Sequence, residues 1–246
     1  MTNHTIDGMD ADALAAALSV PRVALFPRVS STMDEAHHMG AEGAPGGTLV
    51  IADEQTAGRG RGGKRWASGQ NQGLWMTLLE RPGTASGLDV LSLRLGLHAA
   101  PVLELFAGAP VRIKWPNDLY VGSRKLAGVL VEARWRDQKA DWVTIGIGVN
   151  IVSPPGVDTA TGLLPGTRRS VVVLALVPAL RAAAMARGPL TPAELAEYAR
   201  RDFARDRRCL KPAEGVASGI TNDGALIIAG ERGVAYYRAG SLEFAT

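Results

Sequence analysis

The sequence predicts an α+β protein: a mixed, largely antiparallel sheet with helices packed on one face, followed by a small SH3-like β-barrel at the C-terminal end. Three observations lead to this prediction. The chain has 246 residues, 46% of them hydrophobic, which is enough to bury a substantial core. Strand-like runs in its middle are joined by turns of a few residues, as in antiparallel hairpins. After Pro212 the pattern changes to short strands separated by glycine-containing turns at 222–224 and 230–233.

The N-terminal half alternates between helical and extended runs. A short helix is expected over 10–18, where two leucines share one face. A second helix begins near Thr32, because Thr32 and Glu35 have the spacing of a capping box. A helical period over 88–106 contains Pro101, which is expected to kink or split the helix. The strands expected in this half are 23–26, 48–53 and 73–80.

The C-terminal half begins with strands and continues with helices. The strands expected here are 111–115, 119–121, 125–133 and 142–151, with residues 122–124 joining the middle two as a hairpin. A loop rich in proline and glycine follows over 154–166. Helices are expected over 170–187 and 191–208, the second with a cap formed by Thr191 and Glu194. These assignments place a boundary near residue 210 and divide the chain into domains 1–209 and 210–246.

Composition excludes several classes of protein. The sequence has no run of about 18 uncharged apolar residues, so contact with a membrane is not expected. Residues 1–13 do not resemble a signal peptide, and the single cysteine, Cys209, suits a reducing cytoplasm and is expected to be inert. The formal net charge of +3 is too mild for a chain-wide nucleic-acid face. Too few residues precede the first strand for a helix-turn-helix, so DNA binding is not expected.

The most informative segment is the glycine loop, residues 58–66, which contains four glycines, four cationic side chains and a closing tryptophan. Such backbone freedom beside positive charge is typical of a loop that wraps an anion such as phosphate. Its glycines also fit the dinucleotide fingerprint G-x-G-x-x-G. Residues 67–73, however, form turns and do not open a helix, so we reject that interpretation. A basic tract that binds RNA, or a solvated loop, stays open from this segment alone.

Three further segments place polar groups at strand ends; they are 114–118, 124–132 and 146–151. Asn117 and Asp118 follow a strand that Pro116 stops. Lys125 begins a strand in which a glycine permits close approach of another group. Asn150 places an amide where it could read the edge of a base. Each also has a simpler explanation, a plain turn or a satisfied amide, so none decides the function alone.

Together the segments resemble one family, the biotin–protein ligases, also called biotin–acetyl-CoA-carboxylase ligases. The strongest matches are residues 55–61 with Trp66, 114–118, 124–132 and 146–150; the resemblance is firm from residue 31 to about 163 and weak in the C-terminal domain. It implies that residues 1–209 form the catalytic domain and that biotin reacts with MgATP to give biotinyl-5′-AMP and pyrophosphate. The biotinyl group then passes to a lysine of a biotin carboxyl carrier domain in a biotin-dependent carboxylase. Mg²⁺ is implied with ATP, and no metal-ligating side chain is assigned.

The resemblance also implies roles for individual residues. The residues implied for biotin are Ser31, Thr32, Gln55, Gly58, Arg59, Lys125 and Gly128, with the two hydroxyl residues on the ureido group. Those implied for the nucleotide are Arg61, Trp66, Lys114, Asn117 and Asn150, with Asn150 at the adenine. The catalytic residues implied are Lys125, Arg59, Arg61 and Asp118. Asp118 would orient or deprotonate the acceptor lysine, although it could equally pair with Lys125.

The chain departs from the family pattern at three positions. Met33 stands where asparagine is common, and Gly62 and Lys64 stand where arginines are frequent, which puts polar contacts to biotin and phosphate in question. The alternatives are a lipoate or octanoate ligase of the same superfamily and a non-catalytic biotin sensor. The resemblance is to the monofunctional type, without the DNA-binding domain of repressor-type members, and a homodimer is left open. The glycine loop is expected to be mobile alone and ordered with the adenylate.

Overall fold

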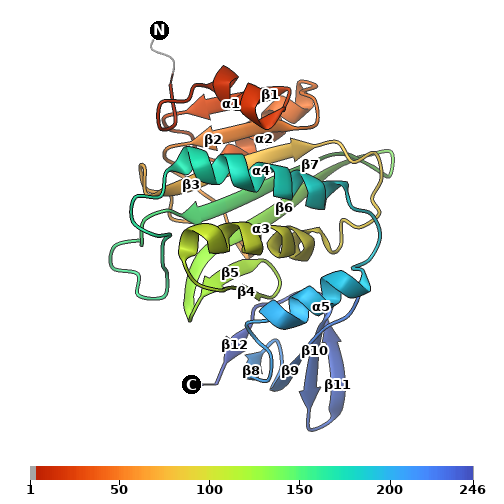
Figure 1. The fold of residues 1–246 in the computed structure, drawn as a ribbon. Coiled ribbons are helices and arrows are strands. Elements are labelled where there is room, and N and C mark those ends of the chain that lie inside the picture. The colour runs from red at the N-terminus through yellow and green to blue at the C-terminus, as the bar shows by residue number, and fades with distance from the viewer. Residues whose placement is uncertain (1–3, 246) are drawn as a thin grey trace.

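Seven of the apolar strand runs assemble into one mixed sheet, in the order β1-β2-β3-β7-β6-β5-β4 (Figure 1). The computed structural model describes residues 4–245. Strands β1 and β2 are parallel, and the remaining neighbours are antiparallel, which confirms the predicted sheet. The strands are β1 (Arg22–Phe26), β2 (Thr48–Ala52), β3 (Gly73–Glu80), β4 (Val111–Lys114), β5 (Asp118–Val121), β6 (Arg124–Arg136) and β7 (Lys139–Asn150).

Helices cover both faces of this sheet, not one face as expected. Helices α1 (Ala11–Leu18), α3 (Leu91–Ala107) and α4 (Arg169–Met185) lie over one face, and Figure 1 shows α3 and α4 side by side in front of the strands. Helix α2 (Thr32–Ala41) packs on the other face, where its Ala36 and Met39 form a small core with Val50. Strands β2 and β3 are buried along their whole length because helices lie on both sides of them.

Helix α3 continues through Pro101, so the predicted split does not occur. Proline inside a helix removes one backbone donor and costs about 3 kcal/mol. Here Leu97 and Leu103 are buried on either side of it, and the helix packs against α4 and β4. Packing of this apolar face holds the helix together across the proline, a tertiary effect that the local sequence does not show.

The last helix is shorter than predicted. Helix α5 (Pro192–Arg201) begins with the expected capping box of Thr191 and Glu194, but it ends at Arg201 instead of 208. Asp202 leaves the helix with an extended backbone, and its carboxylate accepts a hydrogen bond from the N–H of Ala204. That side-chain bond stabilises a local turn at Asp202, so the helix does not continue.

The C-terminal residues form a second, five-stranded antiparallel sheet in the order β11-β10-β9-β8-β12. Its strands are β8 (Arg208–Lys211), β9 (Gly215–Ile220), β10 (Leu226–Gly230), β11 (Gly233–Tyr237) and β12 (Glu243–Phe244). Within residues 4–245 no pairing joins β11 to β12, so a separate antiparallel sheet is confirmed but its closure into a barrel is not. The boundary predicted near residue 210 falls inside β8, and the outer ends of the two predicted domains, residues 1–3 and 246, lie outside the described part.

The long hairpin of β6 and β7 brings distant segments into register. Gly128 pairs with Gly148 and Leu130 pairs with Gly146, while Asp118 on β5 pairs with Gly128. These paired positions face the same side of the sheet, the side on which α2 lies, because directly opposed residues of neighbouring strands share a face. Three of the four segments singled out in the sequence therefore meet on one surface.

Across residues 4–245, every helix is too short or too polar to span a lipid bilayer.

Candidate active site

The glycine loop folds back on itself over the sheet. The N–H of Trp66 donates to the carbonyl of Gly58 at 2.9 Å, and the N–H of Gly60 donates to the carbonyl of Lys64 at 2.7 Å. Between these bonds the chain makes a single 3₁₀ turn over Arg61–Gly63. Gly62 has a φ of 67° and Gly63 a φ of 72°, in the left-handed region that glycine adopts without strain. The glycines therefore let the loop turn tightly and present its cations.

A floor of glycines on β6 and β7 receives the tryptophan that ends the loop. A Cβ placed on Gly148 would lie 2.5 Å from Trp66 Nε1, and one on Gly128 would lie 3.0 Å from Trp66 Cζ3. Gly146 plays the same part for Met33, whose Cε would lie 2.8 Å from a Cβ there. The indole N–H of Trp66 is buried and finds no hydrogen-bond partner among residues 4–245. It is a donor available to a ligand.

A cavity of about 660 Å³ lies between the loop, the glycine floor and the second sheet. Lys125 lines this cavity, and its Nζ is 2.8 Å from Asp118 Oδ1 and 4.8 Å from the ring centroid of Trp66. The cationic side chains that line the cavity are Arg59, Arg61, Lys64, Arg65, Lys114 and Lys125. Aromatic faces beside this many positive charges fit an anion that carries a ring system.

The start of α2 forms the inner end of the site. Ser31 is the N-cap, one residue before the Thr32 that the capping-box spacing indicated, and its Oγ accepts a hydrogen bond from the N–H of Met33. Both the N–H and the hydroxyl of Thr32 donate to Oε1 of Gln55, at 2.9 and 3.1 Å. The amide of Gln55 then donates to Ser68 Oγ at 2.8 Å, so Gln55 ties the helix to the segment that follows the loop.

The second sheet completes the other end of the cavity. Lys114 Nζ lies 5.4 Å from the ring centroids of Tyr120 and Phe244 and 6.0 Å from that of Phe203. Burial lowers the pKa of Lys114, while Asp118 opposes that shift. Arg61 Nη1 donates to the carbonyl of Gly240 at 3.3 Å. The loop, β4 and the C-terminal strand region are thus joined around one opening.

Most residues that the sequence predicted for the site line this cavity. They are Thr32, Gln55, Arg59, Arg61, Trp66, Lys114, Asn117, Asp118, Lys125 and Gly128. Ser31, Gly58 and Asn150 do not. Asn150 is buried and its amide donates to the carbonyls of Lys125 and Thr161, which fastens the loop around residue 161 to β6. A Cβ on Gly58 would lie 2.6 Å from the carbonyl oxygen of Trp66, so Gly58 allows the loop to close.

The cavity also contains residues to which the sequence gave no role. Trp115 and Tyr120 line it; Trp115 lies inside the segment 114–118 singled out above, and Tyr120 lies two residues beyond it. Residues 240–243 line it as well, although they lie more than a hundred positions further along the chain. No local signal predicts that contribution, because it depends on how the second sheet docks.

Within residues 4–245, no group of three or more His, Cys, Asp or Glu side chains is arranged to hold a metal ion. The two carboxylates that line the cavity are paired, Asp118 with Lys125 and Glu243 with Lys211. Mg²⁺ in nucleotide enzymes is commonly held by substrate phosphates with one or two carboxylates. These residues therefore fit Mg²⁺ only as part of a MgATP substrate.

Residues 25–150, about half of the chain, match the biotin/lipoate A/B protein ligase family. The chain belongs to that family. The biotin–[acetyl-CoA-carboxylase] ligase of Paracoccus denitrificans is 32% identical over 231 residues, which cover 85% of this chain and 95% of that protein. The bifunctional ligase/repressor BirA of Bacillus spizizenii is 40% identical over 124 residues, which are 50% of this chain and 38% of that relative. The match thus spans less than half the length of these bifunctional relatives, and only 33% of the BirA of Escherichia coli.

Solved structures of biotin protein ligases share most of this fold. The biotin protein ligase of Aquifex aeolicus, in complex with biotin and ATP, has a TM-score of 0.74 at 25% identity and covers 91% of this chain and 98% of its own. The ligase of Leishmania major, in complex with biotinyl-5-AMP, has a TM-score of 0.61 at 25% identity over 89% of this chain and 99% of its own. These structures confirm the predicted α+β fold and agree with the resemblance to biotin–protein ligases.

Proposed function

We propose that this protein is a biotin–protein ligase that activates biotin with MgATP and transfers the biotinyl group to a lysine of a biotin carboxyl carrier domain. The observation that carries the proposal is the convergence of three cationic segments on one cavity, around a tryptophan seated on glycine. Charge and shape there suit an adenylate, which combines a ring system with a phosphate. The relatives named above support the choice of biotin and ATP as substrates.

In the first step a carboxylate oxygen of biotin attacks the α-phosphorus of ATP, and the bond to the pyrophosphate leaving group breaks. Two anions must approach one another, so fixed cations lower the barrier. Lys125 is our candidate for the group that meets both the carboxylate and the α-phosphate, because its side chain lines the cavity and its Nζ lies over the ring of Trp66. Arg61 and Lys114 are the candidates for the remaining phosphate charge.

In the second step the ε-amine of the acceptor lysine attacks the carbonyl carbon of the mixed anhydride, and AMP leaves. The amine must lose a proton in the process. Asp118 is our candidate for the group that orients the amine or accepts that proton, and it is bound to Lys125 at 2.8 Å. Asp118 would then act in both half-reactions, by holding Lys125 in the first and by serving the acceptor amine in the second.

Some expectations remain predictions: a cytoplasmic location, the lack of DNA contact, and a homodimer. Roles for Ser31 and Gly58 in biotin binding and for Asn150 at the adenine stay predictions too. Because none of the three lines the cavity, we propose that they act by supporting groups that do line it.

The deciding experiment is the exchange of labelled pyrophosphate into ATP, with Mg²⁺ and with biotin, lipoate, octanoate or no acid. Exchange with biotin alone is expected. Exchange with lipoate or octanoate instead would move the protein to the sister activity of its family. Tight binding of biotin without any exchange would identify a non-catalytic sensor, in which Met33, Gly62 and Lys64 mark lost activity.

A further inference from the structure

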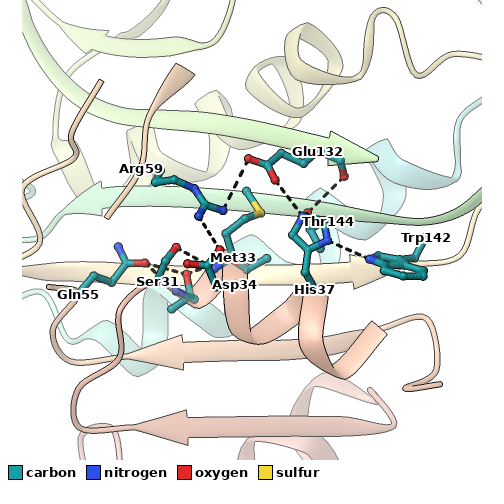
Figure 2. A network of polar contacts seen from close by, with 11 residues as sticks. Ser31, Met33, Asp34, His37, Gln55, Arg59, Glu132, Trp142 and Thr144 are labelled. Atoms are coloured by element: carbon teal, nitrogen blue, oxygen red, sulfur yellow. Dashed lines mark hydrogen bonds and ion pairs between the residues drawn. The ribbon is translucent and has the colours of Figure 1, made fainter. Parts of the chain in front are cut away.

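The guanidinium of Arg59 lies between two carboxylates from different elements (Figure 2). Its Nη1 is 2.5 Å from Asp34 Oδ1 on α2, and its Nη2 is 3.8 Å from Glu132 Oε1 on β6. In Figure 2 the side chain of Arg59 points from the glycine loop toward both acids. Both of these contacts of the guanidinium are to protein carboxylates, although the resemblance implied that this arginine binds biotin.

Behind Glu132 lies a hydrogen-bonded chain that fixes its orientation. Indole N–H can only donate, so the bond of 3.0 Å from Trp142 Nε1 requires an unprotonated Nδ1 on His37. The single proton of the neutral imidazole then sits on Nε2, which lies 2.9 Å from Glu132 Oε2 and 3.1 Å from Thr144 Oγ1. Burial lowers the pKa of His37, against the hydrogen bond to Glu132, which agrees with a neutral ring.

This arrangement divides the two oxygens of Glu132 between two partners. Oε2 accepts the proton that His37 donates, and Oε1 is left facing Arg59. The side chain of His37 is 10% exposed and that of Glu132 is 29% exposed, so their hydrogen bond is partly shielded from water. A carboxylate oriented in this way is prepared to hold a cation that reaches it from the loop.

Arg59 belongs to the glycine loop, so its ion pairs with Asp34 and Glu132 fix the position of that loop. The loop carries four positive side chains in nine residues, and these repel each other when the loop closes over the cavity. Asp34 and Glu132 neutralise the cation that lies at the start of the loop. Arg61 instead faces the ring of Trp115 at 5.9 Å and lines the cavity together with Lys64.

We propose that Asp34, Glu132 and His37 form a socket that holds Arg59 and thereby keeps the glycine loop closed over the bound adenylate. The three are positioning residues: they act on the loop through Arg59 and do not touch the reacting atoms. Arg59 anchors the loop, and Arg61 and Lys64 are left to meet phosphate. The inference rests on the proposed ligase function, since closure matters here for retention of the adenylate.

The test compares Glu132→Gln, Asp34→Asn and the double variant with the wild-type protein. The first readout is the rate at which trypsin cuts within residues 58–66 in the presence of biotin and MgATP. The second is the rate at which preformed biotinyl-adenylate dissociates. Because each partly exposed ion pair shifts an equilibrium by roughly two- to fivefold, we expect increases of about that size in each single variant and about tenfold in the double variant. The melting temperature should stay close to that of the wild type.

A second comparison tests whether His37 acts through Glu132. The substitution His37→Gln should raise both rates in the wild-type background by about as much as Glu132→Gln does. In the Glu132→Gln background it should add little, because residues of one network are not additive. Full additivity of the two substitutions would overturn the part of the proposal that concerns His37.

Glu197→Gln is the matched control, since Glu197 also binds two arginines, on α5 far from the loop along the chain. It should leave loop cleavage and adenylate release unchanged. Unchanged rates in the Asp34 and Glu132 double variant, in a protein whose wild type exchanges pyrophosphate with biotin, would overturn the socket. Absence of exchange in the wild type would instead overturn the ligase proposal, so the two failures are distinguishable.

Discussion

At the scale of single residues, glycines shape the site as much as charged side chains do. Gly128, Gly146 and Gly148 form a surface without Cβ atoms, against which Trp66 and Met33 lie. Met33 is 4% exposed and fills space beside Gly146, so the departure from asparagine in the family pattern has a packing partner in this chain. The sequence predicted close approach of another group, and a biotin contact by resemblance, for Gly128 alone, and gave no role to Gly146 or Gly148.

The substitution Gly148→Ala is expected to lower pyrophosphate exchange at least tenfold, because a Cβ there would lie 2.5 Å from Trp66 Nε1 and the ring must move. Gly96→Ala is the control: its nearest neighbour would be 3.7 Å away, inside helix α3. That change should leave exchange intact and stabilise the protein by about 0.5–1 kcal/mol. Equal exchange in both variants would show that the packing of Trp66 against Gly148 does not affect activation of the acid.

Asp118→Asn separates the two roles open to this carboxylate. If Asp118 serves the acceptor lysine, pyrophosphate exchange should stay within a few-fold of wild type while transfer to a carrier domain falls by roughly 10²-fold or more. Both half-reactions are to be measured on the same preparation. An equal loss in both would mean that Asp118 acts by holding Lys125 at 2.8 Å, and the role as base would be wrong.

At the scale of elements, buried arginines fasten the helices to one another. Arg94 on α3 is 1% exposed and binds Glu194 at the start of α5, with a distance of 2.5 Å between Nε and Oε1. Glu194 also completes the capping box with Thr191, so one carboxylate serves the cap and the ion pair. Burial raises the pKa of Glu194, but hydrogen bonds from Arg94 and Thr191 outweigh that effect and hold it at about 2.

Glu194→Gln is expected to lower the free energy of unfolding at pH 7 by roughly 3 kcal/mol, the size of its pKa shift from 4.5 to about 2. A depressed carboxylate pKa stabilises the fold above the unfolded value of 4.5, and that stabilisation is lost as the pH falls toward 2. The difference between wild type and variant should therefore narrow below about pH 4.5. Urea unfolding at pH 7 and pH 3.5 measures the difference in free energy of unfolding between wild type and variant. The same difference at both pH values would contradict this linkage.

At the scale of the whole molecule, the second sheet is part of the site. Residues 240–243 line the cavity, and Phe244 of β12 stacks with Arg207 at 3.7 Å and lies 5.4 Å from Lys114 Nζ. Two roles are open to this region: it could help to hold ATP, or it could dock the acceptor domain. Its contact with Lys114 and Arg61 favours the first of these.

Phe244→Ala is expected to raise the KM for ATP roughly three- to tenfold, the size of one cation–π contact, with a smaller change in kcat. The reason is that Lys114 loses one of the rings that hold it in place. Tyr236→Ala on β11 of the same sheet is the control, since its ring is 63% exposed and lies outside the cavity lining. Exchange rates at varied ATP give both constants. An unchanged KM in Phe244→Ala would separate the second sheet from nucleotide binding.

The sequence by itself determined the family, the mixed sheet and ten of the cavity residues, because those depend on local signals: apolar runs, glycine loops and polar groups at strand ends. Only the tertiary structure decided the rest. It placed α2 on the opposite face of the sheet, carried α3 through Pro101, and ended α5 at Arg201. It also brought Gly240 to Arg61 and Glu132 to Arg59. These outcomes depend on long-range packing and ion pairing, whose free energies outweigh local preference and leave no trace in the neighbouring residues.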